Sequence, residues 1–319
     1  MTLPYDKTAA VLILPAQAAN QVSDPGLRQW LTRATLNRFA RPPELLQSVL
    51  GILNRPYTDE GLAALRMWGQ TGDRPTVWIA AADPVYLEPR LDHLCLHALQ
   101  NDALSAGDLG ALFDYLQEKL AGHERYGFAR IGSRGYVRAN SPMPTSRSPA
   151  YVIDRQLPNE HMPLDETGTY HSLRGEVEMA LHDHDVNQRR EAAGLPPVNS
   201  LWLWGGGFAP EQETVPHPPL YCSDSLLKGY WLSKTGVVED WPGSIAKCLE
   251  ASVAGFVAQP SPGDADWLER CLGELRTALQ NGRLSHLSLI FGDQYVVDVH
   301  RSDAWKFWRR QSELFEQPS

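Results

Sequence analysis

The stretch from Glu178 to Asp185 contains the residue types that bind divalent metal ions. An imidazole and a carboxylate one helical turn apart can share a metal, and Glu178 and His182 have this spacing. His182 and His184 lie two positions apart, about 200° around a helix, so they cannot share one ion on a regular helix. We therefore interpret His184 as a core histidine and His182 as a solvated one. The metal candidates that remain are His182 and Asp185.

Basic residues that could bind an anion follow on the same stretch. Arg189 and Arg190 precede Gly194, and a guanidinium can grip a phosphate or a carboxylate with two hydrogen bonds. Alternatively, both arginines complement the negative end of a helix dipole. The triplet Gly205–Gly207 would let backbone amides approach a phosphate, but its spacing matches no nucleotide-binding loop and also suits a tight turn. Lys228 adds another positive charge, for which solvated surface is the alternative interpretation.

Composition and charge argue against several classes of function. The chain of 319 residues carries a net charge of −9 at pH 7, so we expect no nucleic-acid partner. No segment approaches the ~20 apolar residues of a membrane helix, so we expect no membrane partner either. Neither a G-x-S-x-G elbow nor a cysteine beside a base supports nucleophilic catalysis. The tryptophans that could stack on bases are expected in the core: Trp202, Trp204, Trp231, Trp241, Trp305 and Trp308.

The cysteines and the N-terminal segment predict a cytoplasmic protein. The four cysteines are far apart and form no C-x-x-C pair, so we expect reduced, buried thiols: Cys95, Cys222, Cys248 and Cys271. The apolar run at 9–14 imitates a secretory signal, but Pro15 ends it early and Asp6 cancels the charge of Lys7. A buried first strand is therefore the preferred interpretation.

Hydrophobic spacing predicts the elements that position these residues. Strands are expected at 7–14, 77–81, 91–99 and 199–204, and helices at 27–39, 44–53, 59–68, 105–120, 172–191 and 223–234. Hairpins are expected around 132–135 and 292–293, followed by a terminal helix near 305–308. The order at the start of the chain is typical of an α/β layered fold, and the middle of the chain is typical of an α+β subdomain.

The central segment resembles a known family. Residues 184–207 read HDVNQRREAAGLPPVNSLWLWGGG, which is similar to a stretch of the archaeal-type cofactor-independent phosphoglycerate mutases in the alkaline-phosphatase superfamily. Pro196–Gly207 resembles more closely a bacterial branch of RpfE-type regulatory proteins. Asp83–Leu87 and Lys228-Gly229 are further likenesses. The resemblance implies an alkaline-phosphatase-like layered core split in sequence, 1–80 and 240–319, with an inserted α+β subdomain at 81–239 that handles substrate.

The departures from the family pattern concern its metal site. Such mutases bind two divalent metals through Asp and His ligands and pass the phosphoryl group through a Ser or Thr. In this chain Leu14 is followed by Pro15-Ala16 instead of Asp-Gly, and Ser48 is the nearest candidate for the nucleophile. Trp204 stands where the enzymes carry an arginine. The late acidic and histidine residues lack the family arrangement: Asp264, Asp266, His286, Asp293, Asp298 and His300.

Taken with the resemblance, the sequence predicts a pseudoenzyme: a binding or regulatory protein without a metal or another cofactor. By position, the anion-binding candidates are Arg189, Arg190, Asn199 and Lys228. The expected partner is a phosphorylated small molecule or another protein. One alternative is an active mutase or phosphatase whose metal site is rebuilt from His182, Asp185 and Asp83. Another alternative is a scaffold with an aromatic protein-binding surface.

Overall fold

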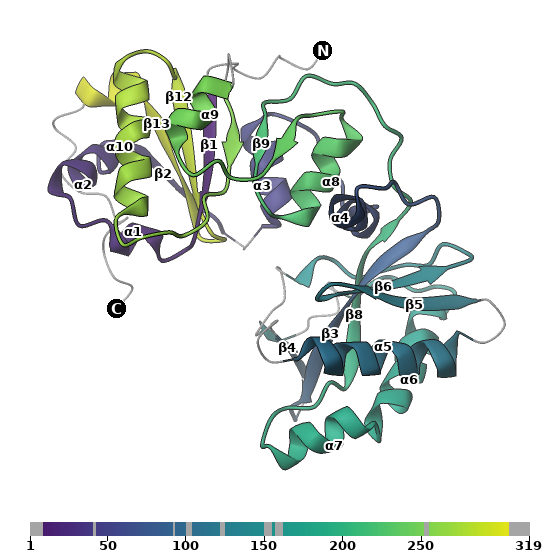
Figure 1. Cartoon of the computed structure of the whole chain (residues 1–319). Coiled ribbons are helices and arrows are strands. Elements are labelled where there is room, and N and C mark those ends of the chain that lie inside the picture. Colours follow the sequence, from purple (N-terminus) through teal and green to yellow (C-terminus); the bar gives the residue numbers. More distant parts are fainter. Residues whose placement is uncertain are drawn as a thin grey trace. The chain divides into compact units, whose positions relative to one another are not determined.

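The structure is a computed structural model that describes residues 9–40, 43–91, 93–99, 104–121, 125–149, 155–156, 162–251 and 255–305. The chain divides into two compact units (Figure 1). We call Met1–Tyr57 with Gln212–Ser319 the split unit, and Thr58–Glu211 the inserted unit. The split unit is therefore assembled from the two ends of the chain.

A seven-stranded sheet forms the centre of the split unit, in the order β10-β9-β11-β1-β12-β13-β2. The strands are β1 (Ala9–Leu14), β2 (Thr35–Arg38), β9 (Leu220–Tyr221), β10 (Val238–Glu239), β11 (Val257–Ala258), β12 (His286–Phe291) and β13 (Tyr295–His300). Strands β10, β9, β11, β1 and β12 are parallel, and β13 pairs antiparallel with both β12 and β2. The N-terminal strand β1 thus lies between two strands from the C-terminal part of the chain.

Both faces of β1 are buried, which explains why its sequence is continuously apolar. Ala10, Leu12 and Leu14 pack into one core cluster with residues of α1 (Ala18–Gln21), α2 (Pro25–Leu31), α9 (Ile245–Ala251) and α10 (Trp267–Gln280). Val11 and Ile13 alternate with these residues, and successive side chains of a strand point to opposite faces of the sheet. Val11 and Ile13 accordingly lie outside this cluster, and they are also buried. Further buried side chains come from α3 (Leu45–Ile52) and α8 (Ser225–Ser233).

The inserted unit is built on a six-stranded antiparallel sheet around the long strand β3. Its strands are β3 (Ile79–Pro89), β4 (Leu94–Ala98), β5 (Tyr126–Ile131), β6 (Arg134–Ala139), β7 (Arg155–Gln156) and β8 (Ser200–Gly207). Strand β8 pairs along one edge of β3, while β6 and then β4 pair along the other edge. Strand β3 therefore has partner strands on both edges near its start and at Val85.

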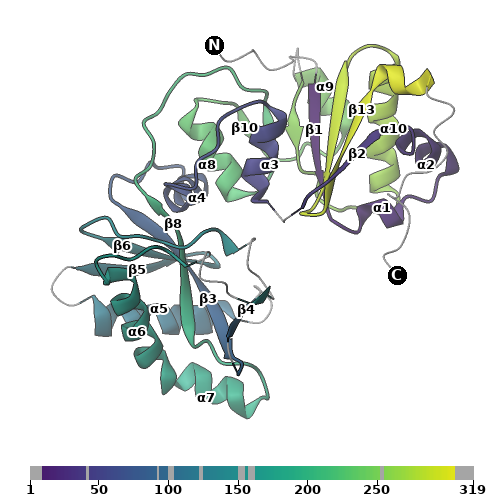
Figure 2. The same ribbon diagram turned by 180° about the vertical axis from the view of Figure 1, so that it is seen from behind.

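Helices cover both faces of this second sheet (Figures 1 and 2). The helices α5 (Ala106–Leu120), α6 (Thr169–His182) and α7 (Asp185–Ala192) contribute to one apolar cluster, which also contains Ala80, Ala82, Leu201 and Leu203. On the opposite face α4 (Leu62–Thr71) packs against β3 and β8. Ser105 caps α5 because its hydroxyl accepts a hydrogen bond from the Asp108 backbone N–H at 3.0 Å.

Most of the expected elements are confirmed, including both hairpins and the helices at 44–53, 105–120 and 223–234. The helix expected at 27–39 is wrong in its second half, because Thr35–Arg38 pairs with β13 as β2. The helix expected at 172–191 is two helices, since the His184 ring accepts a hydrogen bond from the Val186 N–H and starts α7. The start of α4 is at Leu62, after a left-handed Gly61 (φ 75°). The expected terminal helix lies outside the described residues beyond the short 3-10 helix η4 (Arg301–Trp305).

The two units divide at 57/58 and 211/212, whereas the sequence placed the boundaries near 80 and 240. Helix α4 belongs to the inserted unit because it packs on β3 and β8. Strands β9 and β10 and helix α8 belong to the split unit, because β9 pairs with both β10 and β11. Pairing between distant strands sets these boundaries, and local composition does not report it.

The remaining structural expectations concern membranes and cysteines. Within the described ranges, every helix is too short or too polar to cross a lipid bilayer. All four cysteines are free thiols, and Cys222, Cys248 and Cys271 are buried while Cys95 is half-buried. Trp202, Trp204 and Trp231 belong to the core, so these indoles do not form an aromatic surface.

Two glycines of the inserted unit should respond in opposite ways to a methyl group. A Cβ on Gly175, inside α6, would meet nothing within 4 Å, so Gly175→Ala should stabilise the unit by about 0.5–1 kcal/mol. A Cβ on Gly135 would lie 2.1 Å from Phe113 Cζ and 2.2 Å from the Ala82 carbonyl oxygen. Gly135→Ala should therefore destabilise by about 1–3 kcal/mol or more. Urea unfolding followed by circular dichroism measures both, and equal midpoints would contradict the packing described here.

Candidate functional site

The parallel strands of the split unit end along one edge of their sheet, which we call the carboxyl edge. Pro15, Cys222, Gln259 and Gly292 follow β1, β9, β11 and β12, and Asp240 follows β10. The strands are in register there, because Leu14 pairs with Phe291 and Ala258 pairs with Tyr221. In open α/β sheets ligands bind outside the carboxyl ends of the strands. The carboxyl edge is therefore the candidate functional site.

The carboxyl edge carries few groups suited to catalysis. Burial raises the pKa of the Cys222 thiol to about 12, so this cysteine is a poor nucleophile at neutral pH. The Asp224 carboxylate accepts a hydrogen bond from the Leu227 N–H at 2.8 Å and is used as the N-cap of α8. Gln259 Oε1 is buried and accepts no hydrogen bond from the described residues. An amide oxygen of this kind can accept a hydrogen bond from a ligand but cannot act as a base.

Lys228 brings positive charge to the same region. It lies on α8, which starts directly after β9, and its Nζ is 3.2 Å from Asp240 Oδ1. The Asp240 side chain is 90% exposed and that of Lys228 is 24% exposed. An ion pair with one solvated partner contributes little to stability, so an incoming anion can replace Asp240 at low cost.

The metal pair implied by the family resemblance does not fit the residues of the structure. Within the described ranges, no group of three or more His, Cys, Asp or Glu side chains could hold a metal ion. The acidic residues of the C-terminal part of the chain are dispersed. Asp264 pairs with Arg270 at 2.8 Å, and Asp293 is exposed in a turn. Asp298 lies on β13 and accepts a hydrogen bond from Ser288. Asp266 precedes α10, and Ser48 donates to the Glu44 carbonyl within α3.

The alternative metal residues are not brought together in the described structure either. His182 is 83% exposed and lies 3.8 Å from Asp183, its neighbour in sequence. Asp185 is in the first turn of α7. Both oxygens of Asp83 are already used by Arg66 and Trp204. His184 is half-buried beside Tyr115, and burial lowers its pKa, in agreement with its interpretation as a packed histidine.

The anion-binding candidates predicted from sequence divide between the two units. Arg189 Nη2 is 2.7 Å from Asp108 Oδ1, and this hydrogen bond lowers the pKa of Asp108. Arg190 is buried and donates to the Pro196 carbonyl at 2.8 Å. Asn199 accepts from the Leu87 N–H and donates to the Leu87 carbonyl, at 2.8 and 2.9 Å. These three residues are in the inserted unit, whereas Lys228 is in the split unit.

A buried polar network in the inserted unit was not predicted from the sequence. Arg66 of α4 is 4% exposed, and its Nη1 lies 3.0 Å from Asp83 Oδ1 on β3. The same guanidinium donates to the Tyr136 hydroxyl and to the Gly135 carbonyl, and it stacks on the rings of Tyr136 and Trp204. Burial lowers the pKa of Arg66, but Asp83 and Tyr136 outweigh burial and raise it. The sequence feature that could have indicated this network is the position of Arg66 among the buried apolar residues of an amphipathic helix.

A second polar cluster lies on β12 and β13 of the split unit. Ser288 Oγ donates to Asp298 Oδ1 at 2.6 Å, and Asn37 Nδ2 donates to Asp298 Oδ2 at 2.9 Å. His286 Nε2 lies 3.4 Å from the same carboxylate, and the His286 ring stacks on that of His300. Burial alone would raise the pKa of Asp298, but the hydrogen bonds from His286 and Ser288 outweigh burial and lower it. Because Ser288 is 1% exposed, we interpret this cluster as structural.

The two sheets and their helices define a mixed α/β protein in which an antiparallel unit interrupts a mainly parallel one. The same architecture relates the chain to the solved PH0037 protein from Pyrococcus horikoshii, with a TM-score of 0.51 and 15% identity over 93% of this chain and 88% of that one. At this identity the likeness establishes the fold alone.

The curated relatives that the chain matches are cofactor-independent phosphoglycerate mutases. It is 28% identical over 114 residues to the 2,3-bisphosphoglycerate-independent phosphoglycerate mutase of Methanosarcina acetivorans, and 30% identical over 118 residues to that of Methanothrix thermoacetophila. These matches cover 35% and 34% of this chain, and 29% of each relative. No protein-family model matches the chain. The similarity supports a phosphoglycerate mutase-like family at low identity.

Removal of the Arg66 side chain should strongly destabilise the inserted unit. Arg66→Ala leaves the Asp83 carboxylate, 18% exposed, without its cation, and breaking such a buried pair costs about 3–5 kcal/mol. Arg90→Ala is the matched control, because Arg90 forms an exposed pair with Glu88 that is worth about 0–1 kcal/mol. The measurement is the free energy of unfolding in urea. Equal losses in the two variants would contradict the assigned burial.

The Asp298 carboxylate should make stability dependent on acid pH. The pKa of Asp298 is lower in the folded protein than in the unfolded chain. Its contribution to the free energy of unfolding is therefore complete above the unfolded pKa of about 4. That contribution is lost as the pH falls through the lower folded pKa. Asp298→Asn should therefore reduce stability most near neutral pH and least in acid. Chemical unfolding at several pH values measures this, with Asp240→Asn as the exposed control; a reduction independent of pH would contradict it.

Proposed function

We propose that this chain is a phosphoglycerate-mutase-like binding or regulatory protein that does not transfer phosphoryl groups. The observation that carries the proposal is the chemistry of the carboxyl edge. Phosphoryl transfer with two metals requires ligands that clamp both the attacking and the leaving oxygen. Here Pro15 and Gln259 follow the central strands, and the Asp224 carboxylate is used as a helix cap.

The function we propose for the carboxyl edge is to bind a phosphorylated small molecule without converting it. Lys228 supplies a positive charge whose present partner is solvated, and Gln259 supplies an acceptor for a ligand hydroxyl. These residues can hold a phosphate and one polar group of the ligand. The closer resemblance of Pro196–Gly207 to RpfE-type regulatory proteins supports a regulatory role in which ligand binding is reported to another protein.

The absence of turnover is directly testable. The purified chain, supplied with Mn²⁺, Zn²⁺ or Co²⁺, should contain less than one metal per chain by elemental analysis and should not interconvert phosphoglycerates. The mutase of Methanosarcina acetivorans, a curated relative, is the positive control under the same conditions. Stoichiometric metal together with turnover would overturn the proposal in favour of a rebuilt metal site.

The binding function predicts a specific effect of Lys228. Lys228→Ala should weaken the binding of 3-phosphoglycerate by about 1.5–3 kcal/mol, the range for hydrogen bonds to charged groups. Lys247→Ala, an exposed lysine on α9, should leave affinity unchanged. Arg189→Ala tests in the same way whether the arginine of α7 contributes. Isothermal titration calorimetry measures all of these affinities, and unchanged binding in Lys228→Ala would refute a phosphate site at the carboxyl edge.

A further inference from the structure

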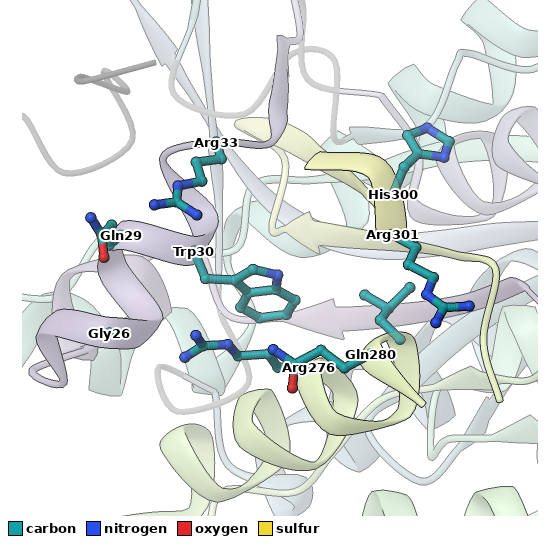
Figure 3. Close-up of a pocket in the computed structure, with 9 residues that line it drawn as sticks. Gly26, Gln29, Trp30, Arg33, Arg276, Gln280, His300 and Arg301 are labelled. Carbon is teal, nitrogen blue, oxygen red and sulfur yellow. The ribbon is translucent and has the colours of Figure 1, made fainter. Parts of the chain in front are cut away.

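A cavity of about 230 Å³ in the split unit is lined mainly by α2 and α10, together with His300 and Arg301 (Figure 3). The guanidinium groups of Arg276 and Arg301 lie on opposite sides of the Trp30 indole and point away from one another, so they do not converge on one ligand. Outside this cavity, the same unit contains a polar atom that lacks a partner. The Nε2 atom of His217 is buried and makes no hydrogen bond to the described residues.

This imidazole belongs to residues 212–219, which we call the strap and which lead from the unit boundary at 211/212 into β9. The strap packs at the C-terminal end of α8, where the last carbonyl groups of a helix lack partners within the helix. The backbone N–H groups of Glu213 and Val215 donate to the carbonyls of Ser233 and Lys234 at 2.8 and 3.3 Å. The strap is therefore docked on α8 by hydrogen bonds that a local opening would break.

The His217 ring packs against aromatic side chains of α8. Its centroid lies 5.5 Å from that of Tyr230 and 5.6 Å from that of Trp231, both in edge-on arrangements. The Trp231 indole N–H donates to the Pro218 carbonyl at 2.7 Å, which holds the strap next to these rings. The imidazole is therefore held between the strap and α8, with its Nε2 atom away from solvent.

The hydrogen bond of His217 determines which of its nitrogens carries the proton. Its Nδ1 atom lies 2.9 Å from the Val215 carbonyl oxygen, and because a carbonyl only accepts, Nδ1 is the donor. In the neutral ring Nε2 is then an acceptor without a proton. A second proton, on Nε2, would create a buried donor without an acceptor among the described residues, which costs free energy. The docked strap therefore favours the neutral imidazole.

The charged groups that face His217 act in the same direction. Burial lowers the pKa of His217, and the positive charges of Arg55 and Lys234 lower it further, while its backbone hydrogen bond partly offsets these effects. The nearby Glu213 carboxylate lies 2.9 Å from Lys234 Nζ and is paired with it. Burial raises the pKa of the Tyr230 phenol, so this neighbour stays neutral. An imidazolium in this position would thus face two cations.

We propose that the strap is a pH-sensitive switch that is docked on α8 at neutral pH and opens in mild acid, when His217 takes up a second proton. In the open strap the ring is in water, where an imidazole has a pKa of about 6.5. Docking is therefore fully stabilised above that value and weakens as the pH falls toward the lower pKa of the docked ring. Release would lengthen the free connection at the 211/212 boundary. The inference does not rest on the proposed function, because it uses none of the residues assigned to ligand binding.

The test measures hydrogen exchange of the Glu213 and Val215 amides in the full-length protein, as protection relative to the intrinsic exchange rate at each pH. Between about pH 7.5 and about pH 5.5, linkage to one proton on an open imidazole predicts a loss of protection of up to roughly tenfold. NMR titration of the His217 ring should give a midpoint below the value of about 6.5 for a free imidazole. Constant protection, or a midpoint at or above the free value, would overturn the proposal.

Two variants remove the proton uptake in different ways. His217→Asn keeps a side-chain N–H that can donate to the Val215 carbonyl, whereas His217→Phe keeps an aromatic ring against α8. Protection of the strap amides should no longer depend on pH in these variants. His182→Asn is the matched control, because the His182 side chain is 83% exposed, and it should keep the full pH dependence. A pH dependence that persists without His217 would assign the effect to another group, such as Glu213, and would overturn the proposal.

Discussion

The pairing of β1 with β11 and β12 is the constraint on which the rest of the molecule depends. Val11 pairs with Val257 on one side and with Ser288 on the other, so contacts spanning most of the sequence must form before the central sheet exists. Such long-range pairing carries a cost in chain entropy that is offset by the continuous burial of both faces of β1. The carboxyl edge is a consequence of this pairing, because it is built from both ends of the chain.

Local signals in the sequence were sufficient for elements that are stabilised within themselves. The Ser105 cap predicted the start of α5, and the Gly132 turn predicted the β5–β6 hairpin. Elements defined by distant partners were missed or misplaced. Leu36 continues the apolar spacing of Leu27, Leu31 and Ala34, which is compatible with a helix. The backbone of Thr35–Arg38 nevertheless pairs with β13, more than 250 residues away. The unit boundaries were displaced for the same reason. Strand pairing assigns β9 and β10 to the split unit, and packing on β3 and β8 assigns α4 to the inserted unit.

The candidate site was less predictable than the fold. The residues of the recognisable central motif are used for structure: Asn187 bonds the Leu181 and Val198 carbonyls and the Val198 N–H, and Asn199 bonds both polar groups of Leu87. An amide side chain with all of these bonds has little capacity left for a ligand. The Arg66 network was missed because a single arginine in an apolar helix gives no indication of which strand supplies its carboxylate. Sequence spacing reports residue type and helix face, but not the partner across the core.

The carboxyl edge offers a charge for recognition but few groups for catalysis. At the carboxyl edge the groups that follow the strands are neutral, capped or paired, and Lys228 has a solvated partner that an anion can replace. The Cys222 thiol at this edge is not an activated nucleophile, because burial raises its pKa to about 12. Charge without an activated nucleophile suits recognition, and this is the physical reason for our proposal that the carboxyl edge binds a phosphorylated small molecule.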